Sequence, residues 1–454
     1  MVETLGEQIS SKKAAYIVAL MFICYGFSYL DRNVLTILTQ SIKHSLLLTD
    51  TQIGVLGGFA FSIFFFLGGL PLSWLIDRTN RVYLIAVCVL IWSCATVTSG
   101  LSTAFPQLLL SRAATAAAEA ALIPAGLSIF ADVLPLRRIP LASSIMMLGA
   151  FVGGGAALYL GGLALTEFSA SGVEHWFLPE FQPWQRVYVA IGLSGLVPIA
   201  LLFFSVREPV RRELAGSKAK NVAPAPSVRR VFSYLFVESR FYAPYLLGIC
   251  SIFLVFYAVN AWFPVFFIRE FNLPAEATGK SLGPAFIVSG IVGTLASQLF
   301  LQQVTPHNII PRVVTLVGCL CVLQAATMAA VPFAPGPVAA ILLYCVVVGV
   351  TGAVVSIMYI PLQLTVPNRM RGQTMGIAYC GVNLLGTGLG PFLIGFINDR
   401  FFASASSLGI SMSIVGIVAS VLAASLFVRA LFVFIRDGIL DCSIDDAPLS
   451  ARVQ

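Results

Sequence analysis

Charged side chains are scarce in this chain, and their scarcity excludes most classes of protein. Asp, Glu, Lys and Arg make up 10% of its 454 residues, whereas hydrophobic residues make up 58%. The apolar runs exceed about 20 residues and recur from end to end, and an α-helix needs that length to cross a bilayer. Transmembrane barrels instead show segments of about ten residues that alternate in polarity. The composition therefore predicts an all-α membrane protein that crosses the bilayer many times.

Residues that carry enzyme chemistry are equally few. The three histidines lie far apart in connections, and the nine cysteines are scattered, mostly in apolar runs, with no metal-binding spacing. The HExxH motif does not occur. Gly279, Lys280 and Ser281 imitate the end of a P-loop, but Pro274 stands where that motif requires glycine. We therefore predict no metal and no cofactor. An integral-membrane enzyme, an ATP-driven pump and a channel are remote alternatives to a carrier.

Breaks at charges, prolines and glycines divide the chain into twelve predicted membrane helices. They cover residues 14–38, 51–76, 82–101, 105–131, 139–166, 185–206, 239–268, 278–301, 311–333, 337–365, 373–398 and 407–435. The only extended polar stretch separates six helices from six. We predict an N-terminal six-helix bundle (1–206), a cytoplasmic linker (207–238), a C-terminal six-helix bundle (239–436) and a cytoplasmic tail (437–454).

Two of the predicted helices, 139–166 and 373–398, carry rows of glycine. Glycine rows let helix backbones approach closely and slide or bend. Paired glycine-rich helices would suit two bundles that rock against each other, and ordinary tight packing is the alternative explanation.

Basic residues are distributed unevenly between the two sides of the predicted membrane. Most lie on the side that holds both termini and the linker, and the other side receives only Lys43, Arg186, Arg269, Lys280 and Arg400. By the positive-inside rule, both termini lie in the cytoplasm. The asymmetry also explains the net charge of +7 without a nucleic-acid partner. Short tails and the lack of an Asn-x-Ser/Thr triplet favour a bacterial inner membrane.

Four charges interrupt the predicted helices. Asp31 and Arg32 lie late in the first, and Arg112 and Glu119 lie inside the fourth. A charge at the middle of a membrane helix costs roughly 3 kcal/mol, so such residues face a protein interior or a watery cavity and usually pair. We predict that Asp31, Arg112 and Glu119 share one cavity near the middle of the membrane, where a carboxylate beside an arginine suits proton coupling. Structural ion pairs between helices are the alternative.

Residues 69–81, GLPLSWLIDRTNR, resemble the loop signature of the major facilitator superfamily between its second and third helices. Asp77, Arg78 and Arg81 match its acidic and basic positions. The sequence YLDRNVLTIL at 29–38, taken with Arg112 and Glu119, is similar to the Spinster-like branch, whose members move lysolipids such as lysophospholipids and sphingosine-1-phosphate. The related anion–cation symporter branch also has a charged first helix. A proton-coupled organic-anion or drug transporter therefore stays the alternative.

The resemblance implies two six-helix bundles around a central cavity that opens to one side and then the other. It also implies that Asp31, Arg32, Arg112 and Glu119 act in proton coupling and head-group binding, in a chain that works as a monomer among membrane lipids. In the mechanism we expect, Arg112 attracts the anionic head. Asp31 and Glu119 compete for that same cation, and one of them takes a proton when the substrate displaces it.

The two halves differ in the charge that they place inside the membrane. The second half has none until the ends of its helices, and its polar candidates for the interior are neutral: Tyr257, Asn260, Gln324, Tyr359, Gln363, Tyr379 and Asn383. Of these we predict that Tyr257, Asn260, Tyr359 and Asn383 bind the substrate. A cavity that is charged on one wall and apolar on the other matches a substrate with an ionic head and a hydrocarbon tail. Burying such a tail contributes about 0.8 kcal/mol per CH₂. The residues therefore favour a lysolipid and disfavour a sugar.

A second charged group lies at the cytoplasmic side. Asp77, Arg78 and Arg81 follow the second predicted helix, and Asp132 ends the fourth. These side chains could form a gate that clamps the cytoplasmic exit when the outer side is open. Topology signals combined with helix capping are the alternative explanation.

Overall fold

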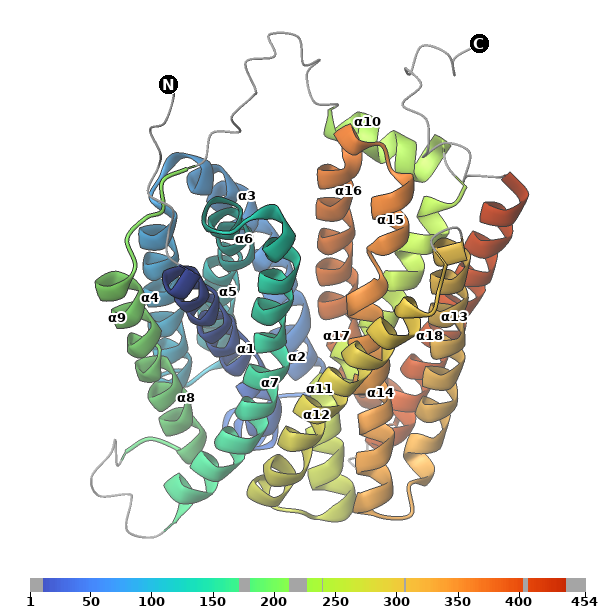
Figure 1. Ribbon diagram of the computed structural model, residues 1–454. Coiled ribbons are helices and arrows are strands. Elements are labelled where there is room, and N and C mark those ends of the chain that lie inside the picture. The colour runs from blue at the N-terminus through green and yellow to red at the C-terminus, as the bar shows by residue number, and fades with distance from the viewer. Residues whose placement is uncertain are drawn as a thin grey trace.

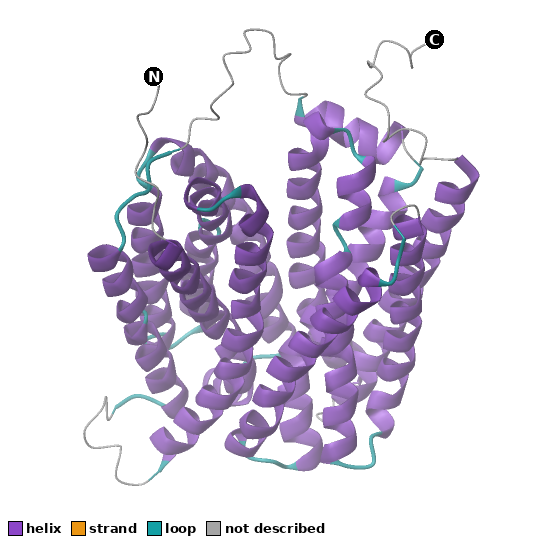
Figure 2. Cartoon of the chain, in the orientation of Figure 1, coloured by secondary structure: helices purple, strands orange, loops and turns teal. Residues whose placement is uncertain are grey.

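The computed structural model describes residues 11–170, 180–211, 227–238, 240–305, 308–402 and 407–437. These residues form helices and short connections, with no strand among them (Figure 2). Twelve candidate membrane spans occur in this part of the chain, as predicted. They are Ser11–Leu46, Asp50–Arg78, Arg81–Gly100, Phe105–Val133, Ile139–Ser169, Pro183–Ser205, Tyr242–Phe271, Ala275–Gln302, Ile309–Phe333, Pro337–Thr365, Met370–Phe402 and Leu408–Arg436.

Several spans are built from more than one helix. The first half contains α1 (Ser11–Leu46), α2 (Asp50–Gly54), η1 (Val55–Phe59), α3 (Ala60–Arg78), α4 (Arg81–Gly100), α5 (Phe105–Glu119), α6 (Leu122–Val133), η2 (Leu136–Arg138), α7 (Ile139–Ser169), α8 (Pro183–Ser194) and α9 (Leu196–Ser205). The second half contains α10 (Val228–Ser233), η4 (Tyr234–Glu238), α11 (Tyr242–Phe271), α12 (Ala275–Gln302), α13 (Ile309–Ala330), η6 (Val331–Phe333), α14 (Pro337–Ile357), α15 (Ile360–Thr365), α16 (Asn368–Gly381), η7 (Val382–Leu389), α17 (Gly390–Ile397), η8 (Asn398–Phe402) and α18 (Leu408–Asp437).

The first span is longer than the sequence indicates. Its prediction ends at residue 38, where the apolar run stops, but α1 continues to Leu46. The added turns contain Gln40, Lys43 and His44, and the side chains of Gln40 and His44 bond each other at 2.9 Å. Gln and Lys are good helix formers, so the loss of hydropathy marks the edge of the membrane and not the end of the helix.

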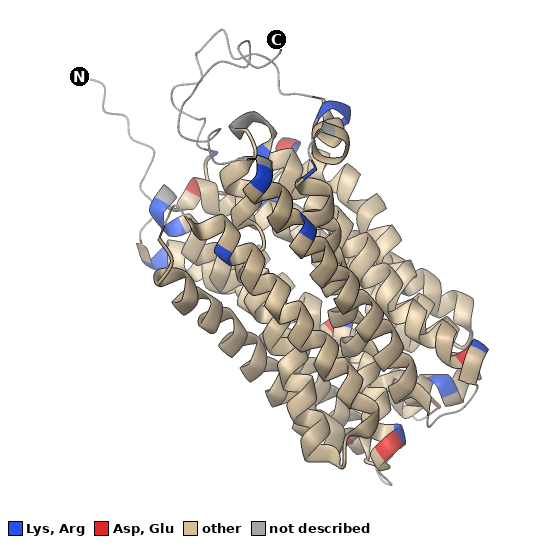
Figure 3. Cartoon of the chain, turned by 90° about the vertical axis from the view of Figure 1, so that its right-hand side faces the viewer, with Lys and Arg blue, Asp and Glu red and all other residues tan. Residues whose placement is uncertain are grey.

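The spans divide into two bodies that follow the order of the chain. Figure 1 shows α1 to α9 on the left, in blue and green, and α11 to α18 on the right, in yellow to red. An even number of spans returns the chain to the side on which it starts. We call the end that carries α10 the linker end and the opposite one the far end. Lys, Arg, Asp and Glu gather at these two ends, and a few lie between (Figure 3). Residues 212–226 of the predicted linker and 438–454 of the predicted tail lie outside the described residues.

The two bodies meet along two lines of contact, both rich in glycine. Along α7 and α12, a Cβ on Gly279 would lie 2.1 Å from the carbonyl oxygen of Leu158, and one on Gly162 would lie 2.5 Å from that of Ala275. Along α2 and α17, a Cβ on Gly395 would lie 2.3 Å from the carbonyl oxygen of Asp50. Only glycine allows backbones to approach this closely, so both predicted glycine rows lie at close contacts between the bodies.

Candidate functional site

The four charges inside the membrane converge, and they do so as two separate ion pairs. Arg112 Nη1 lies 3.7 Å from Asp31 Oδ1, and Arg32 Nη2 lies 2.9 Å from Glu119 Oε2. Asp31, Arg112 and Glu119 are 4%, 1% and 3% exposed. Each carboxylate therefore has its own guanidinium in this structure. That arrangement differs from the expected competition of Asp31 and Glu119 for Arg112, because adjacent residues on a helix point about 100° apart.

The pair of Asp31 and Arg112 is held within the first body. Arg112 on α5 donates to the backbone oxygens of Asp31 and Arg32, each at 3.3 Å, and Thr96 on α4 donates to the Asp31 carboxylate. The long Arg112 side chain extends from α5 and reaches the backbone of α1. This pair joins three helices of one body.

The pair of Arg32 and Glu119 lies nearer to the second body. Glu119 also accepts a hydrogen bond of 2.9 Å from Ser28, and Arg32 lies among aromatic rings. Its guanidinium carbon is 4.7, 4.1 and 5.5 Å from the ring centres of Tyr29, Phe61 and Phe65. Cation–π contacts of this kind hold the planar guanidinium in one orientation. Arg32 is thus a fixed cation whose side chain is 11% exposed.

A cavity lies between the two bodies at the level of Arg32. The first body contributes Tyr29, Arg32, Asn33, Leu35, Thr36, Thr39, Ile53 and Gly57, and the second contributes Tyr257, Asn260, Ala261, Trp262, Thr387 and Pro391. Three of the predicted substrate residues therefore line it: Arg32, Tyr257 and Asn260. The residues lining it from the second body carry no charge.

The other predicted substrate residues lie away from this lining. Arg112 is packed behind α1, and Tyr359 is partly buried at the junction of α14 and α15. Asn383 donates to the carbonyl oxygen of Tyr379 at 2.9 Å. Asn33, Trp262 and Thr387 line the cavity but were not predicted to do so, because a neutral side chain in a membrane helix carries no signal of where it faces.

A polar contact crosses the cavity from one body to the other, since Asn260 on α11 donates to the side-chain oxygen of Asn33 on α1. Two further bonds hold the wall of the second body. The hydroxyl of Tyr344 on α14 donates to the side-chain oxygen of Asn260 at 3.4 Å, and Trp262 on α11 donates to the carbonyl oxygen of Pro391 on α17 at 2.8 Å. Neutral amide contacts are cheaper to break than ion pairs. The two bodies are therefore joined beside the cavity by an amide contact that a ligand can replace.

The charges predicted to form a gate at the linker end are not gathered in one place. Arg81 is 1% exposed and bonds Asp132 at 2.5 Å and Glu208 at 2.7 Å, which joins α4 to α6 and to the residues after α9. Asp77 and Arg78 have exposed side chains, and Arg78 lies 4.3 Å from the ring of Trp74. All of these contacts stay within the first body.

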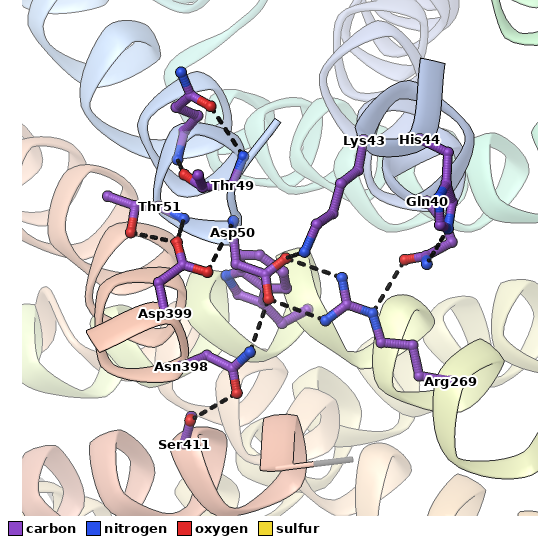
Figure 4. A network of polar contacts seen from close by, with 12 residues as sticks. Gln40, Lys43, His44, Thr49, Asp50, Thr51, Arg269, Asn398, Asp399 and Ser411 are labelled. Atoms are coloured by element: carbon purple, nitrogen blue, oxygen red, sulfur yellow. Dashed lines mark hydrogen bonds and ion pairs between the residues drawn. The ribbon is translucent and has the colours of Figure 1, made fainter. Parts of the chain in front are cut away.

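A charged network that sequence reasoning did not identify joins the bodies at the far end (Figure 4). Arg269 on α11 donates to both oxygens of Asp50 on α2, at 3.0 and 2.9 Å, and Asn398 donates to Asp50 at 2.8 Å. Asp399 accepts from the backbone of Thr51 at 2.6 Å. One signal in the sequence could have pointed to this network. Lys43 and Arg269 are two of the few basic residues on the side of the membrane opposite the termini.

Comparisons with known proteins agree with this architecture. A family model described as Major Facilitator Superfamily matches residues 21–391. The chain is 26% identical over 427 residues to an MFS-type efflux pump of Mycolicibacterium smegmatis, covering 90% of each protein. It is 23% identical over 334 residues to a probable galactarate/D-glucarate transporter of Bacillus subtilis, covering 67% of this chain and 69% of that one.

A solved structure extends the likeness to the fold. It is that of a bacterial homolog of the human lysosomal transporter Spinster, in an inward-facing and unoccupied conformation. The two share 25% sequence identity with a TM-score of 0.79, and the match covers 96% of this chain and 100% of the other.

Proposed function

The chain belongs to the Major Facilitator Superfamily and resembles its Spinster-like branch, and we propose that it carries a lysolipid across the membrane together with protons. The family and the twelve spans make it a multi-pass membrane transporter. The substrate and the coupling ion are the proposal. The observation that carries it is the asymmetry of the cavity, with a fixed cation on one wall and uncharged aromatic and amide side chains on the other.

We place the anionic head group beside Arg32, because this guanidinium is held by rings and lines the cavity. We place the tail against the second body, near Tyr257 and Trp262. Hydrocarbon burial contributes about 0.8 kcal/mol per CH₂, so the tail supplies affinity and the cation selects the head. Arg112 supports the site from behind α1 by holding Asp31 and the backbone of that turn.

Proton coupling follows from the partner of Arg32. When a substrate anion takes the guanidinium, Glu119 loses its cation while it stays buried. A buried carboxylate without a cation is far more stable when it is protonated. Substrate and proton therefore enter together, and Asp31 with Arg112 forms a second pair that can respond in the same way.

Alternating access completes the cycle. In this structure the ion pair of Arg269 with Asp50 joins the bodies at the far end. We place both termini in the cytoplasm of a bacterial cell, so that the far end faces outward and the cavity communicates with the inside. The arginine and carboxylates of the linker end, with Arg81 bonded to Asp132, would then form cross-body contacts only after the bodies rock to the opposite state.

Lipid analysis and transport assays test this proposal. Protein purified in mild detergent should retain single-chain anionic lipids, detected by mass spectrometry, and Arg32→Met should lose them.

In liposomes, a pH gradient should speed lysolipid uptake several-fold, and Glu119→Gln should abolish that acceleration while binding persists. Asp31→Asn tests the second pair. If wild-type uptake ignores the gradient, and both variants transport at the wild-type rate, proton coupling is wrong.

An organic acid is the second candidate substrate, and a specific observation favours it. Arg32 lines the cavity, and the chain is similar to a probable galactarate/D-glucarate transporter. The same liposome assay separates the candidates, since a sugar acid or small dicarboxylate would then compete with or replace the lysolipid. Uptake of such an acid, with no retained lipid, would favour this second candidate.

A further inference from the structure

The Asp50 carboxylate at the far end receives hydrogen bonds from three side chains (Figure 4). Its Oδ1 accepts from Lys43 Nζ at 2.5 Å and from Arg269 Nη2 at 2.9 Å. Its Oδ2 accepts from Arg269 Nη1 at 3.0 Å and from Asn398 Nδ2 at 2.8 Å. The Asp50 side chain is 2% exposed, so it depends on these donors and not on water.

The three donors are divided between the two bodies. Arg269 and Asn398 lie in the second body, on α11 and η8. Lys43 lies on α1, seven residues before Asp50, and the turn between them is closed by a bond of 3.1 Å from the amide of Leu48 to the carbonyl oxygen of Lys43. Lys43 and Asp50 must therefore move together when the bodies separate, while the other two donors leave.

From this geometry we infer that Lys43 is a positioning residue that keeps the Asp50 carboxylate paired after Arg269 has left it. The inference rests on the proposed rocking of the two bodies. Lys43 suits this role because its side chain is 27% exposed and reaches the rim of the contact, whereas that of Arg269 is 6% exposed. Asp50 stays beside Lys43 whether the far end is closed or open, so Lys43 lowers the free energy needed to open it.

The second body likewise keeps hydrogen-bond partners for its own polar side chain, Asn398. When Asn398 leaves Asp50, its side-chain oxygen keeps the hydroxyls of Ser407 and Ser411, at 3.0 and 3.2 Å. Arg269 differs, since its side-chain bonds in the described residues, to Asp50 and to Gln40, all cross to the first body. Arg269 therefore stabilises the closed far end, and Lys43 stabilises the open one.

Variants at these two positions should act in opposite directions. The measurement is single-molecule energy transfer in lipid nanodiscs between dyes attached through unnatural amino acids at Ala104 and Val338, two exposed positions on different bodies at the far end. Lys43→Met should reduce the open fraction about threefold, and Arg269→Met should raise it by a similar factor. Lys43→Arg keeps the charge and should restore the wild-type fraction.

The role of Lys43 is separated from a general loss of structure by Asp50→Asn. With a neutral residue at position 50, Lys43→Met should change the open fraction no further. The inference would be overturned if Lys43→Met had an equal effect whether position 50 holds aspartate or asparagine. The inference would also be overturned if Lys43→Met left the open fraction unchanged while Arg269→Met raised that fraction. If neither wild type nor Arg269→Met ever opens, the rocking of the bodies itself is wrong, which is a failure of the proposed function.

Discussion

Arg32 and Arg112 are the same residue type in one cluster, but their surroundings give them different tasks. Arg112 is buried, holds Asp31 and donates to two backbone oxygens, all within the first body. Arg32 meets aromatic rings and the cavity between the bodies. We therefore expect Arg112 to govern stability and Arg32 to govern substrate binding.

Replacing Arg112 by Met should destabilise the protein by about 3 kcal/mol, because it leaves Asp31 as a buried carboxylate without a cation. Adding Asp31→Asn to the same chain should recover part of that loss, since no charge then remains unpaired. Thermal unfolding in detergent, followed by near-ultraviolet circular dichroism, measures both effects. Arg78→Met removes an exposed arginine and is the control, so its unfolding should change less. Equal losses for Arg112→Met and Arg78→Met would contradict the role given to Arg112.

At the scale of elements, the close contacts between bodies depend on single glycines. Gly395 on α17 faces the carbonyl oxygen of Asp50, where a Cβ would lie 2.3 Å away, and nothing lies within 4 Å of a Cβ on Gly376, in the same span. The backbone at Gly395 cannot yield without moving α2, since the blocking atom is itself backbone.

Gly395→Ala should therefore push the far ends of the bodies apart and raise the open fraction several-fold, whereas Gly376→Ala should leave it unchanged. Alanine in place of glycine stabilises an exposed helix by about 0.5–1 kcal/mol, so the control should fold at least as well as the wild type. The dye pair at Ala104 and Val338 measures the opening. A closed far end in Gly395→Ala would show that the contact of α2 with α17 does not set the distance between the bodies.

The number of spans, their order and the charged residues of the cluster follow from the sequence, because a charge or a break in a long apolar run is visible without any structure. The pairing of the charges does not follow. Asp31 and Arg32 are adjacent, and only the packing of α1 against α5 decides which of them meets Glu119. The Asp50 network was missed for a related reason, since charges at helix ends resemble topology signals and capping residues.

At the scale of the whole molecule, the two bodies contribute unequal walls to one cavity. The first supplies Arg32, and the second supplies Tyr257, Asn260 and Trp262 without a charge. A transporter for compact sugar acids would gain from cations or many amides on both walls, because each carboxylate and hydroxyl that is removed from water needs a partner. The single charged wall is the feature that separates the two candidate substrates.

The unequal walls predict how affinity depends on the length of the substrate's tail. If the tail packs against the second body, each added CH₂ contributes about 0.8 kcal/mol, which is about fourfold in affinity. Competition by lysophospholipids of one head group and increasing tail length, measured in the liposome assay, should therefore give a steep series that levels off once the tail outgrows the cavity. Trp262→Ala should flatten the series, whereas Arg32→Met should weaken every member by a similar factor and leave the slope intact. A flat series in the wild type would place the tail outside the cavity and favour a small organic acid as the substrate.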